Sequence, residues 1–289
     1  VAAALDRRSG DLQWSVDLVK TYGGKVPVWG YSESPLVDGD RVLVTPGGAN
    51  FLIGLDRNSG TKIWGSTGVE APAQYVSVMK GESGGRSYYT TASKPGLYLF
   101  DAETGQGKLA DEATGNGVAV IPTPIIRGEY VYHTSAYGAG NALFKLSGAP
   151  PSVSVEPIYT LSTKTMENHH GGVVLVDDVL YGFTKQGGGA WMAQDFMNGE
   201  TLWQERVRPN RSGSICYADG RLYCYNDKDG TVLLVVPSKD GFQQVGKLTL
   251  PAQTELPRGS GAIWAHPVVS NGRLMIRDQD LLYAFDVSK

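Results

Sequence analysis

A ten-residue motif that returns along the chain constrains its fold more than any other feature of the sequence. The motif is first seen as LDRRSGDLQW at residues 5–14, and it recurs as LDRNSGTKIW at 55–64, FDAETGQGKL at 100–109 and QDFMNGETLW at 194–203. Weaker copies lie at residues 145–148 and 237–241, and the chain ends in FDVSK, which begins at Phe285. The sequence therefore predicts a repeat protein.

Each copy of the motif has the sequence of a β-hairpin. An apolar run predicts one strand, Asp-x-x-Ser/Thr-Gly predicts a tight turn, and a second strand follows. The Asp side chain is expected to accept hydrogen bonds from the backbone N–H groups after it, while glycine supplies the positive φ that closes the turn. Three copies place a tryptophan four residues after the glycine, and we expect these side chains to pack between successive repeats: Trp14, Trp64 and Trp203.

The spacing of the copies indicates the architecture. Asp6 and Asp56 are 50 residues apart, Asp56 and Asp101 are 45 apart, and Asp101 and Asp195 are 94 apart, which is two steps of 47. A period in the mid-forties, without the helical periodicity of about 3.6 residues, is typical of four short strands per repeat, as in a propeller blade.

A second hairpin, clearest in SPLVDGDRVLVTPG at residues 34–47, lies between successive copies. Adding the strands gives two at the start, four in each of five repeats and three at the end, or 25. We therefore predict an all-β fold, a β-propeller of four-stranded antiparallel blades, with residues 1–289 as a single domain. Because the first repeat lacks two strands, the chain is expected to be truncated at its N-terminus within a repeat, and the natural protein to have seven or eight blades.

Charge, hydropathy and cysteine placement exclude several classes of function. The net charge of -3 provides no basic field for nucleic acid, and no run approaches the roughly 18 apolar residues of a membrane helix. Catalytic motifs such as G-x-S-x-G and H-E-x-x-H are absent. Across the turn at residues 219–220, Cys216 is expected to face Tyr223 and Cys224 to face Ile215, which disfavours a disulfide.

The repeat, an apolar residue followed by x-D-x-x-[ST]-G-x-x-x-W, resembles that of the PQQ-type β-propellers. This superfamily contains quinoprotein dehydrogenases and the outer-membrane assembly lipoprotein BamB. Segments such as NHHGGVVLVDDVLYGF at residues 168–183 resemble secreted bacterial proteins described as PQQ-binding-like or alcohol dehydrogenase-like. The resemblance implies a periplasmic or secreted protein. It implies either a binding or scaffold module, with a protein or glycan partner, or a quinoprotein alcohol dehydrogenase that uses PQQ and Ca²⁺.

In a propeller, the connections between blades and those between the second and third strands of a blade lie on one face. These connections are long here and rich in polar and aromatic side chains, so we expect the functional site on that face. The candidate ligand-binding residues are Trp29, Tyr31, Glu33, Tyr75, Asn168, His169, His170, Trp264, His266, Arg277 and Asp278, and Tyr137 and Arg211 belong to the same connections.

These residues allow several kinds of chemistry. His169 and His170 could bind a metal or transfer protons, but neighbours in an extended segment point to opposite sides, which favours a polar or structural role. Glu33 with Asn168 and either Asp227 or Asp278 could supply oxygen ligands to Ca²⁺, and Trp264 could form a flat floor for a quinone. Glu33 or Asp278 would then be the catalytic base. Because the sequence lacks the adjacent cysteines of well-known quinoproteins, the binding module is the favoured hypothesis.

Overall fold

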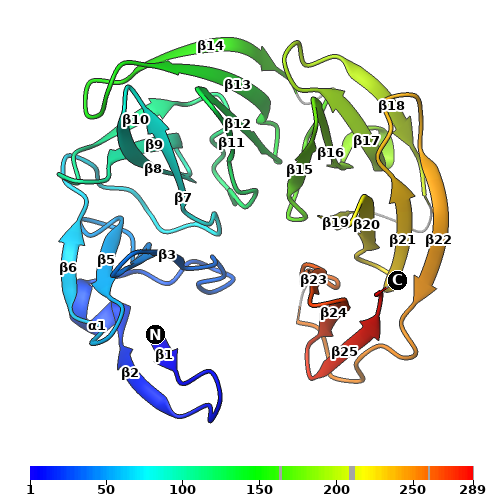
Figure 1. Cartoon of the computed structure of the whole chain (residues 1–289), viewed down its shortest axis with the longest axis horizontal. Coiled ribbons are helices and arrows are strands. Elements are labelled where there is room, and N and C mark those ends of the chain that lie inside the picture. Colours follow the sequence, from blue (N-terminus) through cyan, green and yellow to red (C-terminus); the bar gives the residue numbers. More distant parts are fainter. Residues whose placement is uncertain (163–164, 208–211, 260, 289) are drawn as a thin grey trace. The chain divides into compact units, whose positions relative to one another are not determined.

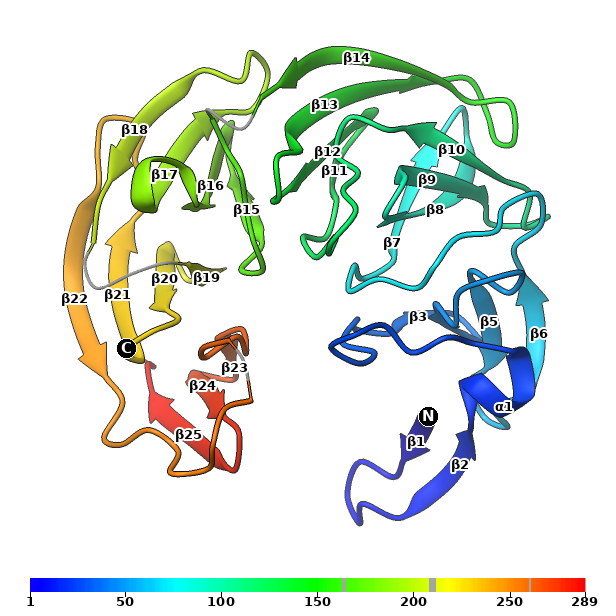
Figure 2. The ribbon, with the colours of Figure 1, turned by 180° about the vertical axis from the view of Figure 1, so that it is seen from behind.

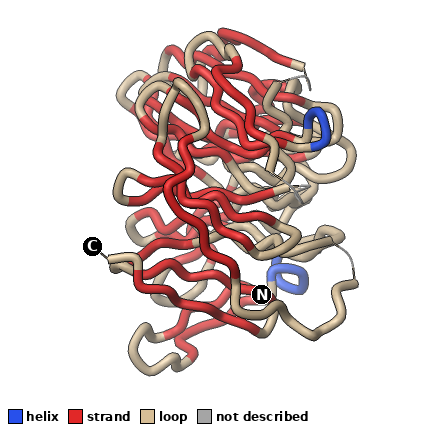
Figure 3. The backbone as a smooth tube through the Cα atoms, turned by 90° about the vertical axis from the view of Figure 1, so that its right-hand side faces the viewer, coloured by secondary structure: helices blue, strands red, loops and turns tan. Residues whose placement is uncertain are grey.

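A computed structural model of the chain describes residues 1–162, 165–207, 212–259 and 261–288. The chain divides into two compact units, Val1–Thr160 and Leu161–Lys289, and Figure 1 labels the elements of each. Strands make up nearly all of the regular structure in both units (Figure 3). That residues 1–289 form a single domain stays a prediction.

The first unit contains, in its described residues, one two-stranded sheet and three four-stranded sheets, each with its strands in chain order. The small sheet is β1 (Ala2–Leu5) and β2 (Leu12–Val16). The larger sheets are β3 (Leu36–Asp38), β4 (Arg41–Val44), β5 (Ile53–Asp56) and β6 (Lys62–Gly65); β7 (Met79–Ser83), β8 (Arg86–Ser93), β9 (Gly96–Asp101) and β10 (Gly107–Asp111); and β11 (Ile125–Arg127), β12 (Tyr130–Ser135), β13 (Gly140–Ser147) and β14 (Ser154–Leu161).

The second unit repeats this plan in two four-stranded sheets and one three-stranded sheet, counted over its described residues. The first two sheets are β15 (Val173–Val176), β16 (Val179–Thr184), β17 (Ala190–Asp195) and β18 (Thr201–Glu205); and β19 (Gly213–Ala218), β20 (Arg221–Asn226), β21 (Thr231–Val236) and β22 (Gln243–Thr249). The last sheet is β23 (Val268–Ser270), β24 (Arg273–Asp278) and β25 (Leu281–Asp286).

Helices are short in the described part of the chain. Helix α1 (Leu18–Tyr22) starts where Asp17 caps the N–H groups of Val19 and Lys20, and it ends at Gly23, whose φ is 68°. A single 3₁₀ turn, η1, spans Gln186–Gly188. No described helix has the length and apolar character that crossing a bilayer requires.

The strand count agrees with the sequence. The described residues form two strands, then four in each of five sheets, then three, which makes 25. The hairpin around the cysteines also has the predicted register, with Cys216 opposite Tyr223 and Cys224 opposite Ile215, and both cysteines are free. These predictions are confirmed.

The repeated turns form as their sequence predicts. Asp56 Oδ1 accepts hydrogen bonds from the backbone N–H groups of Asn58 and Ser59, and Gly60 N–H donates to the Asp56 carbonyl at 2.8 Å. The turns that begin at Asp6, Asp101 and Asp195 repeat this pattern. The Ser59 hydroxyl, which donates to Asp56 Oδ1 at 2.8 Å, and these backbone N–H groups stabilise the ionised carboxylate, so the pKa of Asp56 lies below its usual value.

The repeat tryptophans join each sheet to the next one along the chain. Trp14 Nε1 on β2 donates to the Arg57 carbonyl in the β5–β6 turn at 2.8 Å, and its ring packs on Gly60. Trp64 on β6 meets Tyr89 on β8 edge to face, with ring centroids 5.4 Å apart. Trp203 on β18 donates to the Ser238 carbonyl after β21 at 2.8 Å. Their predicted role in packing between repeats is confirmed.

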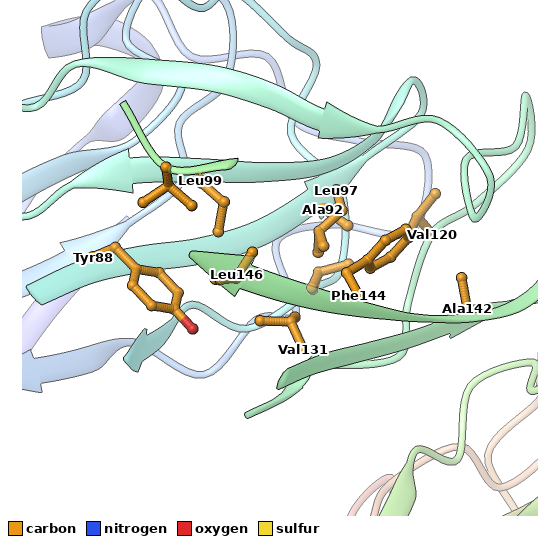
Figure 4. Close-up of a cluster of buried hydrophobic side chains, with 11 residues drawn as sticks. Tyr88, Ala92, Leu97, Leu99, Val120, Val131, Ala142, Phe144 and Leu146 are labelled. Atoms are coloured by element: carbon orange, nitrogen blue, oxygen red, sulfur yellow. The ribbon is translucent and has the colours of Figure 1, made fainter. Parts of the chain in front are cut away.

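Apolar side chains fill the space between successive sheets within each unit. Figure 4 shows one such cluster, in which residues of β8 and β9 meet residues of β12 and β13 and all are buried: Tyr88, Ala92, Leu97, Leu99, Val120, Val131, Ala142, Phe144 and Leu146. In the second unit, equivalent clusters join β16 and β17 to β19–β21, and β20 and β21 to β24. The rigid sheets therefore present their connecting loops from a packed scaffold.

Candidate functional site

The first unit carries an aromatic surface made by three side chains from three different connections. Trp29 lies in the long segment between α1 and β3 (Figure 2), Tyr75 precedes β7, and Tyr137 lies in the turn between β12 and β13. The Trp29 and Tyr75 ring centroids are 5.8 Å apart, and the backbone N–H of Trp29 donates to the Tyr75 hydroxyl at 3.3 Å. Burial raises the pKa of Tyr137, and the charge that Tyr75 can carry raises it further.

The aromatic surface is accessible because its outer members stand clear of the core. Trp29 is 44% exposed and Tyr137 is 41% exposed, whereas Tyr75 is buried. Tyr137 has a φ of 59°, a conformation that costs a non-glycine residue energy. The segment before Trp29 adds two exposed aliphatic side chains, Val26 at 57% and Val28 at 86%.

Two predicted residues anchor this segment to the sheet below it. The carboxylate of Glu33 accepts hydrogen bonds from the backbone N–H and the hydroxyl of Thr45, which follows β4. The Tyr31 hydroxyl donates to the Pro46 carbonyl at 3.0 Å. Burial raises the pKa of Glu33 to about 7, against a smaller lowering by the Thr45 N–H. Glu33 therefore changes its charge near neutral pH.

The second unit gathers an imidazole cluster: His169, His170, Trp264 and His266, with Ser212 beside them. The His169 and His170 rings meet edge to face with centroids 5.4 Å apart, and each lies within 6 Å of the Trp264 ring. The expectation that neighbouring histidines diverge is wrong here. Residues 165–171 do not form a strand, and Asn168 instead closes a turn with Gly172, so successive side chains lack the alternation of extended backbone.

Hydrogen bonds define the protonation of this cluster. His266 Nε2 lies 2.8 Å from the His170 carbonyl, which can only accept, so Nε2 carries the hydrogen. Nδ1 of His170 is 3.0 Å from Ser212 Oγ, and its buried Nε2 has no partner among the described residues. Burial lowers the pKa of His169 to about 4, with a further lowering by Lys185, and it also lowers the pKa of His170 well below the usual value. Both rings are neutral at physiological pH.

Asp278 and Arg277 diverge from one another at the end of β24. Asp278 is buried and forms an ion pair with Arg258, with Nη2 and Oδ1 2.5 Å apart, and its Oδ2 accepts the Thr254 N–H at 3.0 Å. Arg277 is exposed and donates from Nε to the Gln279 carbonyl at 2.8 Å. Asp278 thus ties residues 254–258, in the connection before β23, to β24.

Comparison with known proteins places this geometry in a family. The profile of the family described as "Outer membrane protein assembly factor BamB" matches residues 1–241 of the chain. The chain belongs to this family. Among solved structures, BamB from Moraxella catarrhalis matches with a TM-score of 0.63 and 18% identity, over 98% of this chain and 74% of that one. A computationally designed protein, Ika8, matches with a TM-score of 0.48 and 15% identity, over 91% and 86%. No curated protein sequence matches the chain significantly.

The BamB family match and the likeness to a solved BamB confirm the predicted fold, an all-β propeller of the PQQ-like repeat type. At 18% identity the likeness concerns the fold alone. The candidate residues therefore have to be judged by their own surroundings in this chain.

The oxygen ligands that a Ca²⁺ site would need are used within the fold. The Asn168 side-chain N–H₂ group donates to the Gly172 and Phe183 carbonyls, and its side-chain oxygen accepts from the Gly172 N–H. Asp278 forms an ion pair with Arg258. Among the described residues, no three His, Cys, Asp or Glu side chains are placed to hold a metal together. A Ca²⁺ site and a bound quinone both stay predictions that no contact here tests.

The structure sorts the predicted residues into separate neighbourhoods within each unit. Trp29, Tyr31, Glu33 and Tyr75 lie in the first unit, whereas the imidazole cluster and Asp278 lie in the second. Arg211 lies outside the described residues. Two partners were not anticipated, Arg258 and Thr45. A sequence signal existed for the exposed aliphatic residues, because the run VPVW at 26–29 is apolar yet contains a proline and lies outside any hairpin.

Proposed function

We propose that this BamB family member is an extracytoplasmic binding module that holds a protein partner on the loops at the aromatic surface. The observation that carries the proposal is the exposure of Trp29 and Tyr137 together with Val26 and Val28. Large apolar side chains on a rigid scaffold are typical of the anchors that bury themselves in a partner, and tryptophan and tyrosine dominate such contacts. The family's description as an assembly factor supports a protein partner.

The arrangement favours binding by a preformed surface. Hydrogen bonds from Tyr31 and to Glu33 fix the segment that carries Trp29. The backbone N–H of Trp29 also donates a hydrogen bond to the Tyr75 hydroxyl. Little conformational entropy is therefore lost when a partner binds these loops, so more of the contact energy contributes to affinity. Location outside the cytoplasm rests on the family description and is part of the proposal.

A capture experiment tests this function. The full chain, immobilised, is expected to retain a protein from a periplasmic extract, and Trp29→Ala combined with Val28→Ser is expected to lose it. Val245→Ser, at a valine of β22 that is 56% exposed, is the matched control and should retain the partner. Equal retention by all three proteins would contradict a role for the aromatic surface.

The quinoprotein alternative is separated by a thermal-shift titration with PQQ and Ca²⁺. A ligand that binds only the folded chain must raise the melting temperature by mass action. A saturable rise that Glu33→Ala or Trp264→Ala abolishes would replace the binding module by an oxidoreductase.

A further inference from the structure

A groove of about 660 Å³ opens in the first unit between the sheet β3–β6 and the sheet β7–β10. Its lining comes from the tight turns β3–β4, β7–β8 and β9–β10 together with β6. In an antiparallel sheet these turns lie at the strand ends opposite the connections that carry Trp29 and Tyr75. The groove is therefore distinct from the aromatic surface, and its volume falls within the range of about 300–1,000 Å³ typical of ligand sites.

The floor of the groove is a closed polar network. Lys80 Nζ lies 2.8 Å from Asp38 Oδ1, and the Tyr89 hydroxyl donates to Asp38 Oδ2 at 2.6 Å. The Arg41 guanidinium donates to the Ala102 carbonyl at 2.6 Å and lies over the Trp64 ring. Both cations thus face acceptors of the fold itself.

The third cation of the groove, Arg86, is held still more firmly. Its guanidinium lies 2.9 Å from the buried Asp101 carboxylate and 2.9 Å from Glu103, and it donates to the Pro150 carbonyl at 3.0 Å. An anionic ligand would have to displace these partners before it met a free positive charge. The groove is therefore unsuited to phosphate or nucleic acid.

The most exposed charges of the groove are two carboxylates, and the Lys80 and Arg86 side chains beside them are 38% and 39% exposed. The Asp40 side chain is 78% exposed and the Glu103 side chain 82% exposed. Asp40 has only a long contact to Arg57, at 3.5 Å, whereas Glu103 shares its cation with Asp101. Both have lone pairs available to a further donor.

Hydrogen bonds hold the backbone of both residues in place. The Asp40 carbonyl accepts the Arg57 N–H at 2.8 Å, and the Glu103 N–H donates to Asp101 Oδ1 at 2.8 Å. The repeat turn therefore fixes the position of Glu103. The other copies carry Arg8, Asn58 and Met197 at this position. A side chain specific to this copy is presented by a common scaffold.

Ile63 completes the lining with an aliphatic side chain that is 51% exposed. We propose that this groove binds a basic segment of a protein partner, with the methylene stem of an arginine or lysine against Ile63 and its cationic head at Asp40 and Glu103. Long basic side chains bury their stems on apolar surface while the head stays among polar groups. A small free cation would use the carboxylates but would leave Ile63 exposed.

The test is a fluorescence-anisotropy titration of the full chain with a short labelled peptide of alternating arginine and serine. We expect saturable binding that weakens with salt, and loss of binding to the same peptide with citrulline in place of arginine. Asp40→Asn combined with Glu103→Gln should weaken binding about 2- to 30-fold, as two exposed ion pairs allow. Glu200→Gln combined with Asp240→Asn, exposed carboxylates of the second unit, removes the same charge and should leave the affinity unchanged.

Methyl NMR locates the peptide. The Ile63 methyl resonance should shift on titration, whereas that of Ile158, which is 39% exposed on β14, should not. Equal weakening by the two double variants, or an unmoved Ile63 resonance, would overturn the proposal. Displacement of the peptide by spermidine with an affinity equal to that of the peptide would also overturn the proposal, because it would show that the carboxylates bind any small cation. The double variants change only exposed side chains, and unchanged melting temperatures verify that they fold.

Discussion

Gly60→Ala tests whether Trp14 joins the first sheet to the second as closely as the structure places it. Gly60 closes the β5–β6 turn with a φ of 73°, and a Cβ added there would lie 2.6 Å from Trp14 Cε3 and 2.8 Å from Cδ2. Gly10 closes the same turn one repeat earlier, with a φ of 79° and no atom within 4 Å of an added Cβ. The two substitutions therefore share their backbone strain and differ in the contact with the indole.

The structure sets the size of each effect. An alanine with positive φ costs about 1–2 kcal/mol, which is the whole expected loss for Gly10→Ala. At Gly60 the indole must also move, and overpacking of this kind costs about 1–3 kcal/mol more. Gly60→Ala should therefore lower the free energy of unfolding by about 2–5 kcal/mol.

Urea unfolding of the full chain, followed by tryptophan fluorescence and by circular dichroism, measures both losses. A shift of the midpoint at constant slope reports a change in stability of the native state. Trp14→Ala removes the indole that clashes with an alanine at residue 60. Gly60→Ala should therefore lower the free energy of unfolding less in a Trp14→Ala background than it does alone. Equal losses for Gly10→Ala and Gly60→Ala would refute the packing of Trp14 on this turn.

Three further outcomes are expected. Asp278→Asn should cost about 2–4 kcal/mol of unfolding free energy, less than a fully buried pair because Arg258 is partly exposed, and adding Arg258→Gln should restore part of it, measured by urea titration. Because the pKa of Glu33 rises from 4.5 to about 7 on folding, stability should fall as pH rises from about 4.5 through about 7; Glu33→Gln should remove this slope, and an unchanged slope would assign it elsewhere. Burial raises the pKa of Cys216 to about 11, so a maleimide should label it slowly at neutral pH and rapidly in denaturant; rapid labelling of the native chain would contradict its burial.

The fold could be predicted because its signals are local. Asp56, the residues after it and Gly60 form one turn whatever surrounds them, and the repetition of that turn at a constant period determines the number of strands. The position of Trp14 after the glycine likewise follows from the turn, so its contact with the next repeat could be expected. Helix α1 could not be, because five residues carry too little periodicity to be distinguished from a loop.

The candidate site could be predicted only as a set of loops. Which side chains meet within them depends on tertiary contacts such as Asn168 with Gly172, which turns His169 and His170 toward each other. The pairing of Arg258 with Asp278 joins residues 20 apart across an irregular connection, and no spacing rule predicts it. Residues of two neighbouring sheets line the groove beside Ile63, so no single sequence motif predicts it.

The contacts made by the repeat tryptophans also bear on how the chain folds. The Trp14 bond spans 43 residues and the Trp203 bond spans 35, so the separation is set by the repeat and not by the length of the chain. Topological complexity, expressed as the mean sequence separation of contacts, then stays nearly constant as repeats are added. A sheet that has formed can thus recruit its neighbour through a short loop closure, and assembly can spread along each unit one repeat at a time.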